Sequence, residues 1–155
     1  MLRCLASIVV VVGTLAGCGD IYRYYKSGPV SWALKREVRD NYAQRIVLSD
    51  LTRFAWDELF LFGPYQPKSM VCATLGIGEM QCESRILVTS VDDGEMLIAF
   101  RKSGALVHSE LHYRWHGDFT PLPSVQPIPL SRATFRVVPE GRAAGGGAWL
   151  KLVLE

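Results

Sequence analysis

The sequence predicts an α+β fold, in which a mostly antiparallel sheet of six or seven strands carries one or two helices packed on one face. Between residues 85 and 115, apolar stretches alternate with turn residues, which is typical of β-hairpins. Near residue 31, apolar side chains recur at helical spacing. The chain has 155 residues, of which 49% are hydrophobic. This is enough for the core of one domain, since domains typically have about 100–150 residues.

The first elements are predicted to be a helix and two strands. The helix is expected over residues 32–44, with Ser31 as its cap. Its apolar face has fourfold spacing and consists of Leu34, Val38 and Tyr42. Strands are expected over residues 46–51 and 56–62. The second strand is apolar on both faces beyond Glu58, which places it near the middle of the sheet.

A second helix is predicted over residues 67–75, ended by Gly76 or Gly78. The remaining strands are expected at residues 85–91, 95–101, 105–115, 133–138 and 149–154. Residues 120–130 contain four prolines, which exclude regular structure there.

The N-terminus is predicted to be a signal peptide over residues 1–17. Arg3 gives it a positive start. An apolar run of about 11 residues follows, which is shorter than the roughly 20 needed to cross a bilayer. At its end, Leu15-Ala16-Gly17-Cys18 resembles the lipobox of bacterial lipoproteins, in which cleavage precedes the cysteine and a lipid is attached to it, here Cys18. The alternatives are an ordinary secretory signal and a buried helix that ends in cysteine.

The lipobox resemblance implies a chain anchored to a membrane by acyl groups. Residues 18–30 would then form a lipidated tether, and residues 31–155 a single α+β domain. In such lipoproteins the residues after the cysteine direct sorting, and Gly19 and Asp20 favour the outer membrane of the cell envelope, facing the periplasm. Basic residues outnumber acidic ones between positions 19 and 45. They would either contact anionic headgroups or form a solvated helix face.

A second resemblance lies in residues 56–65. Their pattern of Trp-Asp, apolar residues and Phe-Gly-Pro-Tyr resembles a motif of small uncharacterised bacterial lipoproteins and secreted proteins. The resemblance covers ten residues and implies no activity. Trp56 and Tyr65 are expected in the core, with a binding surface as the alternative.

Two of the four cysteines are already assigned, because Cys4 lies in the predicted signal peptide and Cys18 is the predicted lipid attachment point. Cys72 and Cys82 form an even pair in an oxidising compartment, which predicts a disulfide between the second helix and the following strand. Such a bond would contribute about 2–3 kcal/mol. Metal ligation and a redox dithiol are the alternatives, but no further ligand lies at suitable spacing and the chain has no C-x-x-C motif.

Three histidines recur at intervals of four residues and would form a metal site on a helix. The residues around them alternate between apolar and polar, which indicates a strand, and successive histidines would then lie about 13 Å apart. No metal site is therefore predicted. The polar face is expected to be solvated. A second hypothesis makes it a partner surface that weakens on protonation below about pH 6.5. The face consists of His108, Glu110, His112, Arg114 and His116.

Composition and motifs narrow the function classes. A net charge of +2 argues against nucleic acid binding. The motifs of hydrolases, zinc proteases, phosphate loops and dinucleotide sites are absent from the sequence, so no catalytic residue and no cofactor are predicted. The favoured hypothesis is a membrane-tethered periplasmic lipoprotein that binds another protein through its sheet or its proline-rich loop. Inhibitors and immunity proteins share this plan, which does not fix function. A structural or assembly accessory of an envelope complex and a hydrolase are the alternatives.

Overall fold

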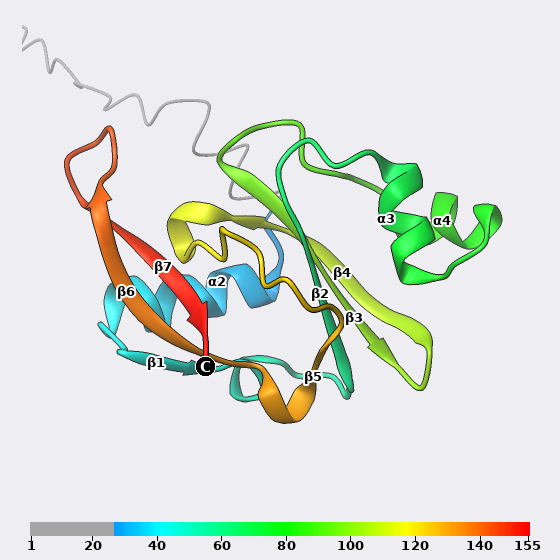
Figure 1. Ribbon diagram of the computed structural model, residues 1–155, viewed down its shortest axis with the longest axis horizontal. Helices are drawn as coiled ribbons and strands as arrows, with labels where there is room; N and C mark the ends of the chain where they lie inside the picture. The colour runs from blue at the N-terminus through cyan, green and yellow to red at the C-terminus, as the bar shows by residue number, and fades with distance from the viewer. Residues whose placement is uncertain (1–26) are drawn as a thin grey trace, which may run out of the picture.

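The computed structural model of the protein describes residues 27–155. These residues form antiparallel sheets and short helices (Figure 1), which confirms the predicted α+β class. The prediction of one sheet of six or seven strands is only partly matched. The seven strands divide into a four-stranded and a three-stranded sheet.

The four-stranded sheet has the order β4-β3-β2-β5. β3 (Glu95–Lys102) and β4 (Ala105–Tyr113) form a hairpin close to the predicted bounds. β2 (Glu58–Phe62) lies between two neighbours, as its apolar sequence predicts, and the short β5 (Ile128–Pro129) pairs with its outer side. The side chains of β2 beyond Glu58 are buried on both faces of the sheet.

The three-stranded sheet has the order β1-β6-β7. β6 (Thr134–Arg142) and β7 (Ala148–Leu154) form the predicted C-terminal hairpin. β1 (Arg45–Val47) is shorter than the predicted strand over residues 46–51, because the chain turns into a 3-10 helix at Leu48–Leu51.

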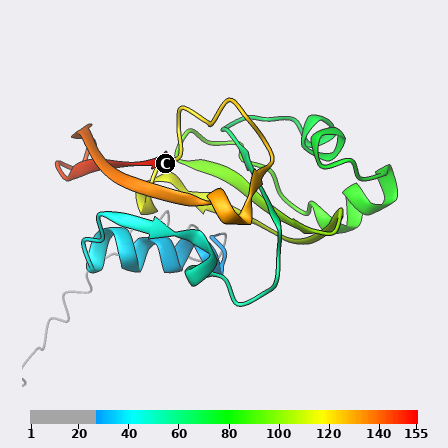
Figure 2. The same ribbon diagram turned by 60° about the horizontal axis from the view of Figure 1, so that its bottom comes forward.

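The N-terminal helix begins earlier than expected. α2 (Pro29–Lys35) starts inside the range predicted as tether and continues as a π-helical turn, Arg36–Asp40. Proline suits the first position of a helix because the missing N–H would have no partner there. The predicted helix is therefore present, but its bounds of residues 32–44 and its Ser31 cap are wrong. α2 lies under the sheets (Figure 2), and its apolar side chains pack against residues of both sheets in one core.

Two further helices carry the disulfide. α3 (Lys68–Leu75) ends at Gly76, whose left-handed φ of +65° permits the stop, as predicted. The predicted strand at residues 85–91 is wrong, because α4 (Glu79–Arg85) occupies the preceding residues and no regular structure follows it. The disulfide between Cys72 and Cys82 is present, with 5.7 Å between the Cα atoms. It joins α3 to α4 rather than a helix to a strand.

The predicted signal peptide, Cys18 and most of the tether lie outside the described residues. Within the range 27–155, no helix is long and apolar enough to cross a membrane.

Candidate binding groove

The segment of residues 117–129 separates the two sheets. At its start it pairs with β7 through one residue: the Asp118 amide donates to the Leu150 carbonyl (2.9 Å), and the Leu152 amide donates to the Asp118 carbonyl (2.8 Å). Pro121 and Pro123 follow, and proline has no amide hydrogen with which to continue a ladder. The segment therefore leaves β7 and crosses to β2, where it forms β5. This is why a single continuous sheet does not form.

A groove of about 690 Å³ opens where the segment leaves β7. We call it the β7 groove. Its volume falls within the range of about 300–1,000 Å³ typical of ligand sites. One wall is the proline-rich segment, and the other is formed by β6 and β7. The apolar lining includes Pro123, Val125, Pro127, Val138 and Val153. The charged side chains at its border are Arg132, Glu140 and Lys151.

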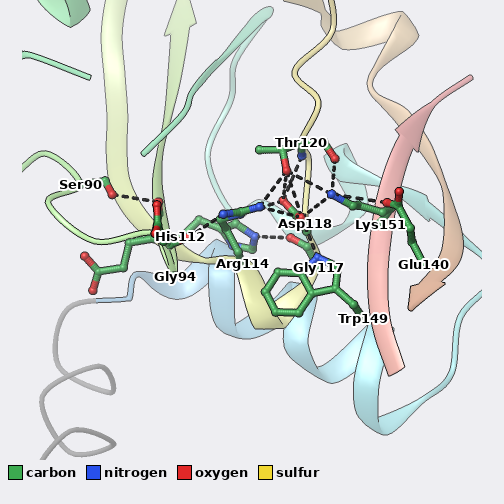
Figure 3. Close-up of polar contacts among 12 residues, drawn as sticks. Ser90, Gly94, His112, Arg114, Gly117, Asp118, Thr120, Glu140, Trp149 and Lys151 are labelled. Carbon is green, nitrogen blue, oxygen red and sulfur yellow. Dashed lines mark hydrogen bonds and ion pairs between the residues drawn. The ribbon is translucent and has the colours of Figure 1, made fainter. Parts of the chain in front are cut away.

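A buried carboxylate holds two residues that line the groove, Thr120 and Lys151 (Figure 3). Asp118 has no solvent exposure and accepts hydrogen bonds from Arg114 Nε (3.0 Å), Trp149 Nε1 (2.7 Å) and Lys151 Nζ (2.7 Å). Thr120 donates to it from both its amide and its hydroxyl. Burial alone would raise the pKa of Asp118, but the hydrogen bonds from Arg114 and Lys151 outweigh it and hold the pKa well below the usual range. Asp118 is therefore an ionised structural anchor.

Lys151 has several partners around Asp118. Besides Asp118, its ammonium donates to the Thr120 carbonyl (2.7 Å) and lies 3.5 Å from a Glu140 carboxylate oxygen. Figure 3 shows the side chain extended between these groups. Arg132 differs, because it is exposed and has no ion-pair partner among the described residues. Arg132 is thus the cation that the groove leaves available.

The outer edge of β7 is open beside the groove. The Glu155 amide donates to the Thr134 carbonyl of β6 (3.0 Å), and antiparallel pairing alternates along a strand. The backbone groups of Leu152 and Leu154 therefore point away from β6. Asp118 accepts from the Leu152 amide. Within residues 27–155, the Leu152 carbonyl and the Leu154 amide have no partner, and both residues line the groove.

The outer edge of β2, on the other side of the proline-rich segment, is covered. The Gln126 side chain accepts from the Leu61 amide (2.7 Å) and donates to the Leu61 carbonyl (2.9 Å). One side-chain amide thus replaces the backbone of a neighbouring strand. The segment covers the β2 edge at Leu61 and leaves the β7 edge exposed to the groove.

The predicted histidine face is buried rather than solvated. Glu110, His112 and His116 are 7%, 0% and 4% exposed, because α2 packs over them. β4 ends at Tyr113 and the chain turns back through a 3-10 helix, so the rings of His112 and His116 lie 6.3 Å apart. The expectation of a solvated strand face is therefore wrong, and these residues do not line the groove.

Side chains from α2 and β4 hold this buried face together. The Glu110 carboxylate accepts from the amides of Val30 (3.2 Å) and Ser31 (2.7 Å), so Glu110 caps α2 in place of the predicted Ser31. His108 Nε2 lies 2.6 Å from Glu110, and Arg114, the fifth predicted face residue, bonds Asp118.

A serine joins the two buried histidines. The Ser31 hydroxyl lies 3.0 Å from His112 Nδ1 and 2.9 Å from His116 Nδ1. Burial lowers the pKa of His112, and burial together with the neighbouring His112 lowers the pKa of His116 to about 3. Ser31 has no solvent exposure, so this contact secures the packing of α2.

The two aromatic ends of the Trp-Asp to Pro-Tyr motif lie in different environments. Trp56 is in the core at 4% exposure, as predicted. Tyr65 is 59% exposed, so its predicted core position is wrong.

Sequence reasoning located the proline-rich segment but missed Asp118, Lys151 and the open β7 edge. The four prolines were the available signal, but the prediction that they exclude regular structure over residues 120–130 is wrong in part, because β5 forms at Ile128–Pro129. No group of three His, Cys, Asp or Glu residues within the described range is placed to hold a metal ion. Comparison of the chain with protein-family models, curated proteins and solved structures finds no significant match.

Proposed function

We propose that this protein is a binding module of the bacterial cell envelope, anchored to a membrane by a lipid on Cys18, and that the β7 groove receives part of a protein partner. The observation that carries the proposal is the groove itself. Its lining is mainly proline, valine, leucine and isoleucine, and Asp118 holds the lining residues Thr120 and Lys151 in place. A preformed apolar cleft with a few placed polar groups is the usual form of a binding site.

The polar groups bonded to Asp118 favour binding over chemistry. Lys151 and Asp118 bind each other and Thr120, so these groups are already saturated. What remains for a partner is apolar surface, backbone groups of β7 and the side chain of Arg132.

The anchor and the groove are compatible in space. The chain enters the fold at Ser27, which pairs with Leu111 on β4. Nine residues lead from Cys18 to Ser27, and they span at most about 30 Å. β4 and β5 are the two outer strands of the four-stranded sheet, and the groove lies beside β5. A tether along β4 would leave the groove accessible.

Site-specific crosslinking in the producing cells tests the proposal. A photoreactive amino acid is placed in the full chain at Val125 or Val153, which are 70% and 42% exposed, and at Met80 on α4, which is 86% exposed. We expect one adduct of discrete mass from each groove position and none from Met80.

A second substitution ties the adduct to the groove. Val138→Asp places a charge on the groove wall and should abolish the Val125 adduct, whereas Val91→Asp, at an exposed valine outside the groove, should leave it unchanged. Equal adducts from Met80, or an adduct insensitive to Val138→Asp, would contradict the proposal. An adduct of twice the chain mass would also overturn it, because the occupant would then be a second copy.

A further inference from the structure

Resting on this proposed function, we infer that the partner enters the β7 groove as an extended segment that adds a strand to β7, through hydrogen bonds with the Leu152 carbonyl and the Leu154 amide. An acceptor and a donor two residues apart on one edge are the groups to which a further strand pairs.

The start of such a strand already exists within the chain. Asp118 occupies the position next to Lys151 and takes the first pair of outward groups on β7. After Thr120 the prolines lead the chain away, and the next outward groups of β7 face the groove. An incoming segment would continue the line that Asp118 begins.

The walls of the groove favour a single extended chain. The proline-rich segment runs beside the open edge from Thr120 to β5, and it is fastened to β2 by Gln126 and by β5. The edge of a folded sheet would bring its own neighbouring strand against this wall. A lone segment brings only its side chains.

The lining specifies the chemistry of that segment. In a strand, alternate side chains point to the same face. One set would lie beside Val153 and face the prolines, so we expect apolar residues at alternate positions. Arg132 lies two residues before Thr134, which pairs with Glu155 at the end of β7. Because its guanidinium is exposed, we expect the partner segment to carry a carboxylate at that end, which would form an ion pair with Arg132.

The experiment uses the full chain in detergent and a display library of random 12-residue peptides. Selected peptides are synthesised, and their affinity is measured by calorimetry for the wild type and for two variants of one position. Leu154→Pro removes the outward amide hydrogen but keeps the ladder to β6, since proline is tolerated on an edge strand when its nitrogen faces outward. Leu154→Ala is the matched control, because it trims the side chain and keeps the N–H.

We expect Leu154→Pro to bind about tenfold more weakly than Leu154→Ala, the loss of about one hydrogen bond. Arg132→Glu should weaken the binding of peptides that carry an acidic residue to a similar extent, and Arg142→Glu, at another exposed arginine, should not. Urea unfolding of each variant shows that it is folded.

The outcomes separate this inference from the proposed function. If Val138→Asp abolishes binding while both Leu154 variants bind alike, strand addition is wrong and the groove remains a binding site. If no peptide is selected although the Val125 crosslink forms, strand addition is also wrong, because the partner then requires a folded surface. If the chain self-associates and Leu154→Pro abolishes this self-association, the occupant of the groove is a second copy, and the inference is overturned. If crosslink and peptides both fail, the proposed function fails as well.

Discussion

Asp118 shows how one side chain can organise distant parts of a chain. It joins Arg114 and Thr120 nearby to Trp149 and Lys151, more than 30 residues further on. In the sequence it is one of 15 acidic residues with no local pattern around it. Its role depends on contacts that only the folded chain creates, so sequence reasoning could not single it out.

Asp118→Ala is expected to lower the free energy of unfolding by about 3–5 kcal/mol, the range for breaking a buried ion pair. Two cations that are 18% and 15% exposed would lose their shared partner. Urea unfolding at pH 7 measures the change. Asp40→Ala removes an exposed pair with Lys35 and should cost less than about 1 kcal/mol. Equal effects of the two substitutions would refute the anchoring role.

The buried histidines predict a loss of stability in mild acid. Above pH 6.5 both are neutral in the folded and the unfolded chain. Because burial lowers the pKa of His112 and His116, only the unfolded chain takes up these protons as the pH falls. Below pH 6.5 each adds a loss of up to about 1.4 kcal/mol per pH unit, so stability should fall by at most about 4 kcal/mol between pH 7.5 and pH 5.

Urea unfolding between pH 7.5 and pH 5 measures this dependence. Asp118 does not contribute in that window, because its lowered pKa matters only below about pH 4, the usual value of an aspartate. His116→Gln should halve the slope with pH. A stability that is constant from pH 7.5 to pH 5 would show that the two histidines are protonated in the folded chain as well.

Helices and strands whose formation depends on residues close together in the sequence were predicted well. The β3–β4 hairpin follows from alternation around a short turn, and α3 ends at a glycine as expected. α4 was missed because most of its residues are exposed and give no apolar stripe. Only Cys82 and Ile86, four residues apart, are buried. That spacing was the one helical signal, and Ile86 was instead taken as part of a strand.

The disulfide is expected to stabilise the α3–α4 unit locally. Replacing Cys72 and Cys82 together by serine should lower the free energy of unfolding by about 2–3 kcal/mol, the value for a loop of this length. Hydrogen exchange should accelerate most in the two helices and least in β6 and β7. Uniform acceleration across the chain would contradict a local effect. Exchange in both helices that matches the wild type would mean that packing alone holds them.

The whole molecule differs from the predicted plan chiefly in its division into two sheets. The predicted strands near the C-terminus exist, but the prolines at residues 121 and 123 interrupt the segment between β7 and β2, so no continuous strand joins the two sheets. The prediction that one face of β4 is solvated is wrong for a related reason. α2 covers it through contacts between residues about 80 positions apart, which local alternation cannot reveal.

Cys18→Ala tests the anchor of the whole molecule. If the cysteine carries the lipid, the variant should move from the membrane pellet to the soluble fraction after cell lysis and ultracentrifugation, because two or three acyl chains supply the binding. The lipid-linked mass of the N-terminal peptide should disappear with it. Gly19→Ala, next to the cysteine, should leave both readouts unchanged. A variant that still pellets with membranes would contradict the lipoprotein prediction.

The open edge of β7 has a consequence for a protein confined to a membrane surface. Unpaired strand edges are templates for aggregation, and a lipid anchor would crowd many copies into one plane. The proline-rich segment stands against the edge and offers no amide hydrogens from its prolines, so a flat sheet from a neighbour would meet an obstacle. The same prolines that divide the two sheets would thus hinder the β7 edges of neighbouring molecules from pairing with each other where many copies are crowded on a membrane.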